Sequence, residues 1–234
     1  MYKRILILLI LLIPVMATAQ KAKPKNDSNY DERLLHFGFS MGLNTMDFNA
    51  KMNPSDTNNW TAEVVSLKPG INIQIVMDYR PTTYLDVRFL PGVSFGQRNL
   101  NFYDEDGVLV NDEQQLESSF LEFPLLIKGK GMRLNNSRPY LIGGINFRYD
   151  LAAKKEYDED SDVYIRLRKA DFYYEVGAGI DFYLPYFKLT IEAKMSNGLR
   201  DVLVHDEPHP YYPQYVNSIE SLKSQMWVLS FHFE

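Results

Sequence analysis

Eight stretches of the chain alternate large apolar residues with polar or small ones. In Leu35–Leu43, for example, every odd position is large and apolar and every even position is polar or small. Alternation with a period of two is the signal of a β-strand. The runs of about nine to twelve residues exceed the usual length of about five or six and match the roughly 9–11 residues of a tilted membrane-crossing strand. The pattern predicts eight strands, in residues 35–43, 71–78, 85–95, 121–128, 141–149, 172–182, 187–195 and 227–234.

The connections between these strands alternate between short and long. The short ones are residues 79–82, 131–138 and 184–186, and the long ones are residues 44–67, 97–118, 150–170 and 198–223. Structureless loops of that length argue against a compact soluble domain. They fit an eight-stranded antiparallel outer-membrane β-barrel, which has short periplasmic turns and long extracellular loops. An even number of strands also places both chain ends on the periplasmic side.

The two faces of the predicted strands differ in character. One face is rich in aromatic and aliphatic residues and almost free of charge, as lipid-facing positions require. An eight-stranded barrel has an interior just wide enough for side chains to fill. We therefore expect a plugged, ion-paired lumen without a pore; the alternative, a soluble lipocalin-like barrel, would turn the apolar face inward. The polar face carries Asp78, Asp86, Arg88, Glu122, Lys128, Arg148, Glu175, Asp181, Lys188, Glu192 and Lys194.

The N-terminus has the features of a secretory signal peptide. Lys3 and Arg4 precede the apolar run Ile5–Ile13, and Ala17–Ala19 provides an A-x-A cleavage site. Nine helical residues reach only about 14 Å, roughly half of a bilayer core, which disfavours a membrane anchor. We predict a signal peptide in residues 1–19, a flexible periplasmic segment in residues 20–33 and the barrel in residues 34–234. The predicted location is the outer membrane of a Gram-negative bacterium.

Composition excludes several classes of function. The 234 residues contain no cysteine, so a disulfide scaffold, a thiolate zinc site and a thiol nucleophile are all excluded. The formal net charge is −5, whereas nucleic-acid-binding proteins are usually strongly basic. We expect the partners to be the lipid bilayer and other proteins, with no nucleic acid and no small-molecule substrate.

Candidate catalytic and metal-binding groups are sparse. His205 and His209 flank acidic residues and suggest a metal site, but two nearby prolines favour a solvated loop. Barrel lipid hydrolases use serine and histidine, and the pairs to consider are Ser230 with His232 and Ser196 with His205. None of these forms an evident oriented dyad or triad. We therefore predict a protein that is not an enzyme, with no catalytic, cofactor-binding or metal-binding residues.

Two acidic runs have simpler interpretations. Asp104–Gly107 resembles part of a calcium loop but lacks its third acidic position and its terminal glutamate, which favours a hairpin turn. Residues 158–162 form an acidic run that is typical of a solvated loop.

Two terminal motifs resemble the PorT family. The first is His36–Asn44, followed by Asp47 and Phe48, and the second is Asn217–Ser224, which leads into Trp227–Glu234. Leu121–Lys128 is similar to a motif shared more widely among outer-membrane barrels of Bacteroidetes. The resemblance implies an outer-membrane component of the type IX secretion system, which exports proteins with a C-terminal signal, including proteases and gliding adhesins. It implies no catalytic residues. The alternative is a passive or adhesive OmpX-like barrel.

The last long connection is the candidate partner-binding loop. Residues 201–223 contain Tyr211, Tyr212 and Tyr215 among three prolines. Tyrosine is enriched at energetically important positions of protein interfaces. We expect this loop to contact other secretion proteins; the alternative is a loop that packs over the barrel mouth.

Overall fold

The computed structural model describes residues 25–26, 30, 32–53, 60–104, 106–110, 114–153, 164–206 and 208–234. The predicted signal peptide, most of segment 20–33 and the acidic run 158–162 lie outside these residues. No helix in the described ranges is long and apolar enough to cross a membrane, a finding that does not concern strands. The elements are β1 (Leu35–Met52), β2 (Thr61–Leu67), β3 (Pro69–Thr82), β4 (Leu85–Phe89), β5 (Gly92–Tyr103), β6 (Gln114–Lys130), β7 (Ser137–Asp150), β8 (Ala170–Tyr183), β9 (Lys188–Gly198), the short helix α2 (Gln214–Asn217) and β10 (Ile219–Phe233).

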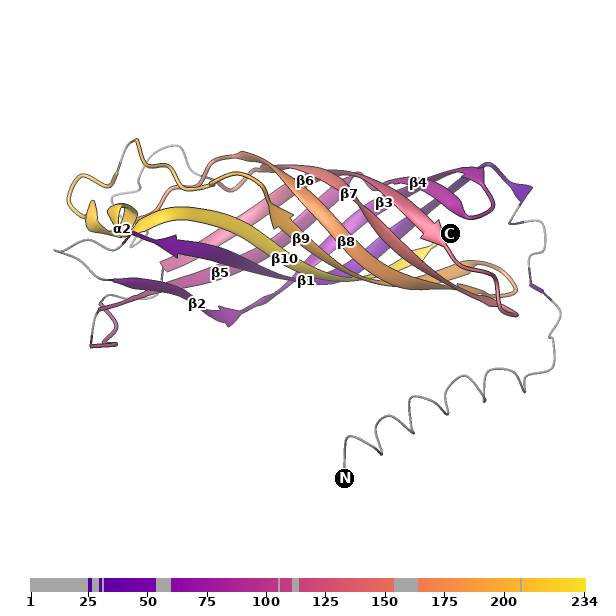
Figure 1. The fold of residues 1–234 in the computed structure, drawn as a ribbon, viewed down its shortest axis with the longest axis horizontal. Helices are drawn as coiled ribbons and strands as arrows, with labels where there is room; N and C mark the ends of the chain where they lie inside the picture. The colour runs from indigo at the N-terminus through magenta and orange to yellow at the C-terminus, as the bar shows by residue number, and fades with distance from the viewer. Residues whose placement is uncertain are drawn as a thin grey trace, which may run out of the picture.

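The ten strands form a closed antiparallel barrel with eight strand positions around the ring, each of which we call a stave (Figure 1). β2 and β3 are separated only by Lys68 and make one stave, and β4 and β5 are separated only by Leu90 and Pro91 and make another. Proline has no N–H for the ladder, but Pro91 O still accepts from Ile75 N at 2.9 Å. β1 pairs with β10 on one side and with β3 on the other, which closes the ring. The predicted eight-stranded barrel is confirmed.

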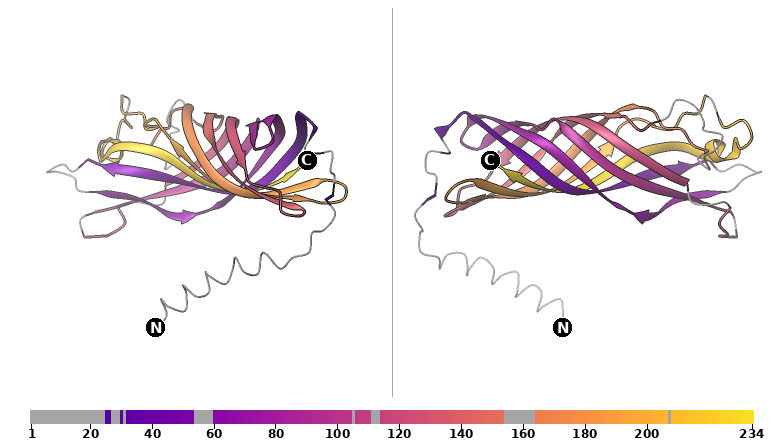
Figure 2. Two further views of the ribbon diagram at one scale, coloured as in Figure 1. Left: turned by 45° about the vertical axis from the view of Figure 1, so that its right-hand side comes forward. Right: turned by 180° about the vertical axis from the view of Figure 1, so that it is seen from behind.

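The two ends of the barrel differ, as Figures 1 and 2 show. The C-terminus lies at the end with the short connections β3–β4, β6–β7 and β8–β9, which we call the turn end. Helix α2 and the longer connections lie at the opposite end, which we call the loop end.

The strands run further toward the loop end than the sequence pattern predicted. Much of the predicted loop 44–67 is strand, because β1 continues to Met52 and β2 begins at Thr61. The predicted loop 97–118 likewise contains the end of β5 and the start of β6. On β1 the extension still alternates, but with apolar Met46 and Phe48 inside and polar Asn49 and Lys51 outside, so a search for apolar outward faces did not detect it.

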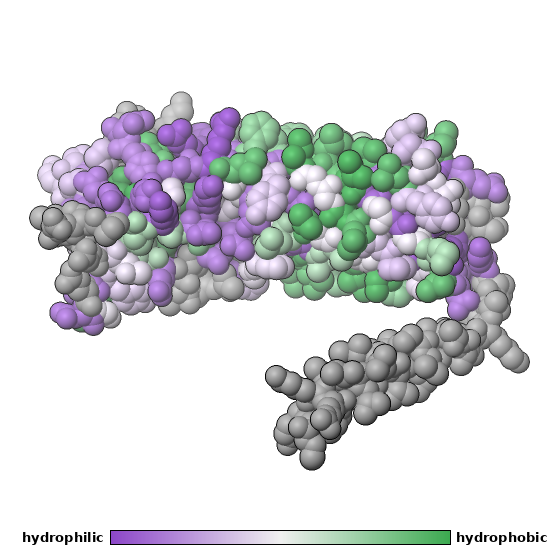
Figure 3. Space-filling view, viewed as in Figure 1, coloured by the Kyte–Doolittle hydropathy of each residue, from purple (hydrophilic) through white to green (hydrophobic). Residues whose placement is uncertain are grey.

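Exposed apolar side chains form a belt around the half of the barrel nearer the turn end, which we call the turn half. Figure 3 shows one face of this belt. On β1 it runs from Leu35 to Leu43, about 26 Å along the strand and about 20 Å after a 40° tilt, close to the ~25 Å band of membrane barrels. Phe95, Tyr149 and Trp227 lie on its rim toward the loop end. The exposed side chains of the belt include Leu35, Phe37, Phe39, Met41, Leu43, Ile71, Ile73, Ile75, Phe95, Phe123, Leu125, Ile127, Leu141, Ile145, Tyr149, Phe172, Val176, Trp227 and Leu229.

The remaining part, the loop half, has an apolar core instead of a polar lumen. On β1, Met46 and Phe48 are buried, whereas Asn49 and Lys51 are exposed. The connection before β10 contributes Val202, Leu203 and α2 to the same core. The buried core consists of Phe48, Ala62, Leu100, Phe102, Leu116, Ile165, Val202, Leu203, Tyr215, Val216, Ile219 and Leu222.

Candidate functional site

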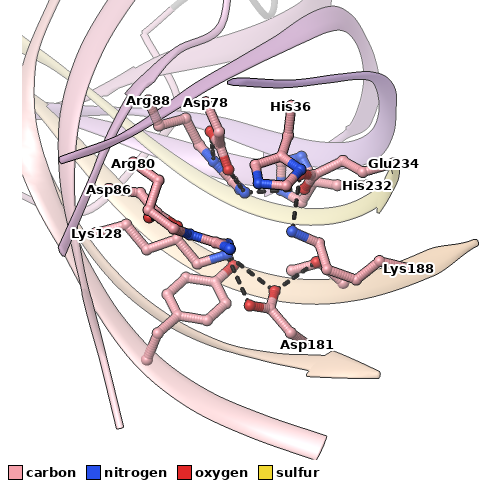
Figure 4. A network of polar contacts seen from close by, with 12 residues as sticks. His36, Asp78, Arg80, Asp86, Arg88, Lys128, Asp181, Lys188, His232 and Glu234 are labelled. Carbon is pink, nitrogen blue, oxygen red and sulfur yellow. Dashed lines mark hydrogen bonds and ion pairs between the residues drawn. The ribbon is translucent and has the colours of Figure 1, made fainter. Parts of the chain in front are cut away.

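The lumen of the turn half holds a cluster of paired ionisable side chains (Figure 4). Arg88 on β4 donates from Nε and Nη2 to Asp78 on β3, both at 2.7 Å. Arg88 Nη2 also lies 3.0 Å from Oε1 of Glu234. Lys188 Nζ donates to the other oxygen of Glu234 at 2.7 Å. The last residue of the chain is therefore held inside the barrel by two cations.

A second group of pairs lies closer to the loop end. Arg148 on β7 lies 2.7 Å from Glu122 Oε1 and 3.1 Å from Glu175 Oε1. Lys194 Nζ on β9 lies 2.8 Å from the other oxygen of Glu175. Each of these four buried charges thus faces an opposite one from a neighbouring strand, which offsets the cost of removing both from water.

The lumen of the described barrel is packed with buried polar side chains, among them Arg88, Lys128 and Glu192. The cavity between the Arg148 group and the apolar core has a volume of about 10 Å³, enough for about one water molecule. Its lining includes Arg98, Arg148, Asp171 and Tyr173. Within the described residues, the lumen is filled by side chains.

The candidate serine and histidine pairs are placed as follows. Ser230 and His232 are both buried on β10, and His232 Nε2 lies 3.6 Å from Glu192 Oε1. Ser196 Oγ donates to Glu175 Oε1 at 3.1 Å. His205 instead pairs with Asp201, so Ser196 and His205 each have a different partner.

Tyr30 covers the lumen at the turn end. Its hydroxyl donates to Glu234 Oε2 at 2.8 Å, and its carbonyl accepts from Arg80 Nη1 at 2.9 Å. Its ring stacks on His36 with centroids 4.0 Å apart. Burial raises the pKa of the Tyr30 hydroxyl, which keeps it a hydrogen-bond donor. Segment 20–33 is thus attached to the barrel at Tyr30.

At the loop end, the three candidate tyrosines have different environments. Tyr215 on α2 is only 3% exposed, whereas Tyr211 is 82% exposed. Tyr215 stacks on Tyr164 at 5.0 Å and meets the edge of Phe102 at 4.8 Å. The prediction that Tyr215 faces a partner is therefore wrong, because the apolar core takes up its ring. Tyr211 and Tyr212 remain candidates.

The two exposed tyrosines belong to an aromatic patch, which consists of Tyr164, His209, Tyr211 and Tyr212. His209 Nδ1 accepts from the main-chain N–H groups of Tyr211 and Tyr212, both at 3.3 Å. The Tyr164 and Tyr212 rings lie 4.7 Å apart, and those of His209 and Tyr212 lie 5.5 Å apart. The patch is continuous with the buried core through Tyr164, which gives it a fixed base.

Asp201 fastens the same connection to β10. Its Oδ1 accepts from Leu222 N at 2.9 Å and from Leu203 N at 3.0 Å, and its Oδ2 lies 2.9 Å from His205 Nε2. Partial burial raises the pKa of Asp201, but the two N–H donors and His205 outweigh this and leave the pKa below its usual value. His205 thus serves to anchor the loop. The described residues contain no group of three or more histidine and acidic side chains placed to hold a metal.

The predicted hairpin turn at Asp104–Gly107 is confirmed. Asp104 Oδ1 accepts from Asp106 N at 3.1 Å and from Val108 N at 2.8 Å. Gly107 has a φ of 74°, a conformation that favours glycine.

Residues 18–204 match the profile of a protein family described as "outer membrane protein beta-barrel domain". The chain belongs to this family. A search of curated proteins found no match to the sequence.

Solved structures similar to this outer-membrane β-barrel include three bacterial outer-membrane proteins. AlkL, solved in lipid bilayers, has a TM-score of 0.43 and 11% identity over 92% of this chain and 92% of its own. OprG from Pseudomonas aeruginosa has a TM-score of 0.43 and 12% identity over 85% of this chain and 92% of its own. Ail, the attachment invasion locus protein of Yersinia pestis, has a TM-score of 0.37 and 14% identity over 84% of this chain and 96% of its own. Membership rests on the family profile.

The outer-membrane location orients the molecule. Barrels of this kind have short turns on the periplasmic side and long connections outside. The turn end with Tyr30 and the C-terminus therefore faces the periplasm, and the aromatic patch faces outward. The apolar belt lies in the bilayer between them.

The ion-paired lumen is confirmed for all eleven charges named from the sequence, each of which is buried. Further buried cations were missed, among them Arg80 and Lys130. Arg80 Nε and Lys130 Nζ share Asp86 Oδ1, at 3.2 Å and 2.5 Å. Each lies two residues beyond a predicted inward charge, Asp78 or Lys128, so continuing the alternation past the apolar runs could have found both.

Proposed function

We propose that this outer-membrane barrel is a non-enzymatic accessory or assembly component of type IX protein secretion. The observation that carries the proposal is the pair of PorT-like motifs at the two ends of the chain. The first lies on β1, and the second runs from the end of α2 into β10. These two strands pair directly, with Asp47 opposite Gln225 and Phe48 opposite Ser224. The residues that carry the resemblance thus form one two-stranded ribbon at the barrel seam.

A filled lumen supports an accessory role. A barrel whose interior is occupied by ion pairs does not pass a folded protein, so export has to run through another component. Function then resides on the surface, and loops are where binding residues concentrate. The aromatic patch around Tyr211 and Tyr212 is the proposed contact site for secretion proteins.

A non-enzymatic role fits the placement of the serine and histidine side chains. Ser230 and His232 lie inside the packed lumen, where an acyl substrate has no access. His205 is used to hold the loop through Asp201. Neither arrangement supplies a nucleophile with an oriented base.

The test is export in a strain that lacks the gene. We expect proteins with the C-terminal secretion signal to accumulate in the periplasm and wild-type complementation to restore their export. Complementation with Tyr211→Ala/Tyr212→Ala should restore barrel levels but not export. The matched control is Tyr186→Ala, an exposed tyrosine at the turn end, which should restore both. Normal export in the deletion strain would contradict the proposal.

The alternative is a passive or adhesive OmpX-like barrel. The exposed aromatic patch on a plugged barrel favours it, since such a surface also suits attachment. Under this alternative, deletion leaves export intact and changes envelope integrity or adhesion.

A further inference from the structure

One seam of the barrel opens in the loop half. The pairing of β1 with β3 ends at Thr45 and Pro69. Beyond this point, residues 46–52 pair only with β10, and residues 61–67 of β2 pair only with β5. No strand pairing joins these two segments in the described part of the chain. Figures 1 and 2 show β2 lying apart from β1 in the loop half.

A groove of about 380 Å³ lies between the two unpaired edges. Asp47, Phe48 and Ala50 line it from β1, and Ala62 and Glu63 line it from β2. Leu100 of β5, fully buried, also contributes to the lining. Asn49 and Gln225 complete the lining, so the groove combines buried apolar side chains with two amides and two carboxylates.

The β1 edge presents main-chain groups to this groove. Asn53 N donates to Ser218 O at 2.8 Å, on the side of β10. Because main-chain groups alternate sides along a strand, those of Phe48, Ala50 and Met52 face the groove. The Phe48 N–H donates to the carboxylate of Asp47 at 2.7 Å, a local substitute for a missing ladder partner.

We propose that this groove binds an extended segment of a partner protein as an added β-strand. Two facing strand edges supply main-chain hydrogen bonds that a polypeptide backbone satisfies at the spacing of a sheet. Alternate side chains of the segment then face inward and outward. The inward ones point toward the buried core at Phe48 and are apolar, and the outward ones lie near Asp47 and Glu63 and are basic.

The position of the groove favours a peptide over a lipid chain. The apolar belt on β1 ends at Leu43. Asp47 lies four residues further along, about 13 Å at strand spacing, and therefore outside the hydrocarbon region. An acyl chain also has no donors or acceptors for the open edges. The inference goes beyond the proposed secretion role and does not depend on it.

A designed peptide tests the proposal in the full chain reconstituted in lipid bilayers. The probe is an eight-residue peptide that alternates lysine and valine, with a proline-interrupted version and a glutamate–valine version as controls. We expect the lysine–valine peptide to shift the amide signals of residues 46–52 and 61–67. Both controls should bind at least about fivefold more weakly.

Two sets of variants sharpen this test. Asp47→Asn/Glu63→Gln should weaken binding of the lysine–valine peptide about fivefold, as expected for the loss of two exposed charge pairs. Ala50→Pro removes one N–H that faces the groove and not β10. The barrel should therefore still fold, but it should bind the peptide more weakly. Asn49→Pro instead removes an N–H that faces β10 and should destabilise the barrel.

Three outcomes would overturn the proposal. The first is a lack of shifts at both edges, and the second is shifts confined to the aromatic patch. The third is contact between lipid acyl chains and Phe48 or Leu100 in the absence of peptide. A defect in export with unchanged peptide binding would support the secretion role separately.

Discussion

The turn half and the loop half of this barrel use the same strands with opposite arrangements of polarity. On β1, Ser40 and Asn44 point inward and Leu43 points outward in the turn half. A few residues further on, Phe48 is buried and Asn49 is exposed. The strand keeps its period of two throughout. What changes is the solvent, which is lipid around the turn half and water around the loop half.

This difference changes what stabilises each half. In the turn half the outer surface is in lipid, so the interior can be polar provided that its charges are paired. In the loop half, removal of apolar surface from water supplies the driving force, as in a soluble domain. Variants placed in the two halves should therefore fail in different ways.

Arg88→Met should have the largest effect. It removes the cation that pairs with both Asp78 and Glu234, so these two buried carboxylates lose a positively charged partner. We expect the free energy of unfolding to fall by about 3–5 kcal/mol, measured by denaturant titration in lipid vesicles. The control is Lys51→Ala, which removes a 2.7 Å surface ion pair with Glu220. The Lys51 and Glu220 side chains are 67% and 50% exposed, so this pair should contribute about 0–1 kcal/mol. Equal losses of unfolding free energy in the two variants would show that the buried lumen pairs contribute no more than an exposed pair.

Leu222→Ala tests the loop-half core. The side chain is fully buried among the core residues, and its truncation should cost about 2–5 kcal/mol. The loss should be local, so hydrogen exchange should accelerate at loop-half amides such as Val202 N, which donates to Leu222 O at 2.9 Å. Amides of the belt should be unaffected. Faster exchange throughout the barrel would show that the two halves unfold together.

A charge on the outer surface should distinguish the halves directly. Ile75 lies near the middle of the belt on β3, and Ile75→Arg should cost about 2–4 kcal/mol of folding free energy in a bilayer. Asn49→Arg, also outward but in the loop half, should change stability by no more than about 0.5 kcal/mol. Similar costs at both positions would show that the bilayer is not confined to the turn half.

The smallest expected effect is the pH dependence at Asp201. Because its pKa is lower in the folded protein, its ionised form stabilises the loop at pH values above the ordinary aspartate pKa. This contribution is lost as the pH falls through the depressed folded value. The protection of Leu203 N and Leu222 N against hydrogen exchange, measured relative to the intrinsic rate at each pH, should therefore fall in acid. Asp201→Asn should remove this acid dependence, whereas persistence of the dependence would assign it to another group.

The sequence predicted the turn half well and the loop half poorly, for one reason. Strand prediction relied on apolar residues facing outward, as in Phe37, Phe39 and Met41. Met46 and Phe48 follow the inverse arrangement and were assigned to a loop. The same assumption left Tyr215 as a surface residue, although the core of the loop half buries it.

The sequence by itself determined the stave number, the lipid-facing surface and the charges of the lumen. These follow from a period of two and from the choice of outer solvent, both of which can be read locally. Only the tertiary structure decided which charges pair, where the strands end, and that β1 and β2 separate beyond Thr45. Those features depend on contacts between residues far apart in the chain, such as Arg88 with Glu234, which no local pattern specifies.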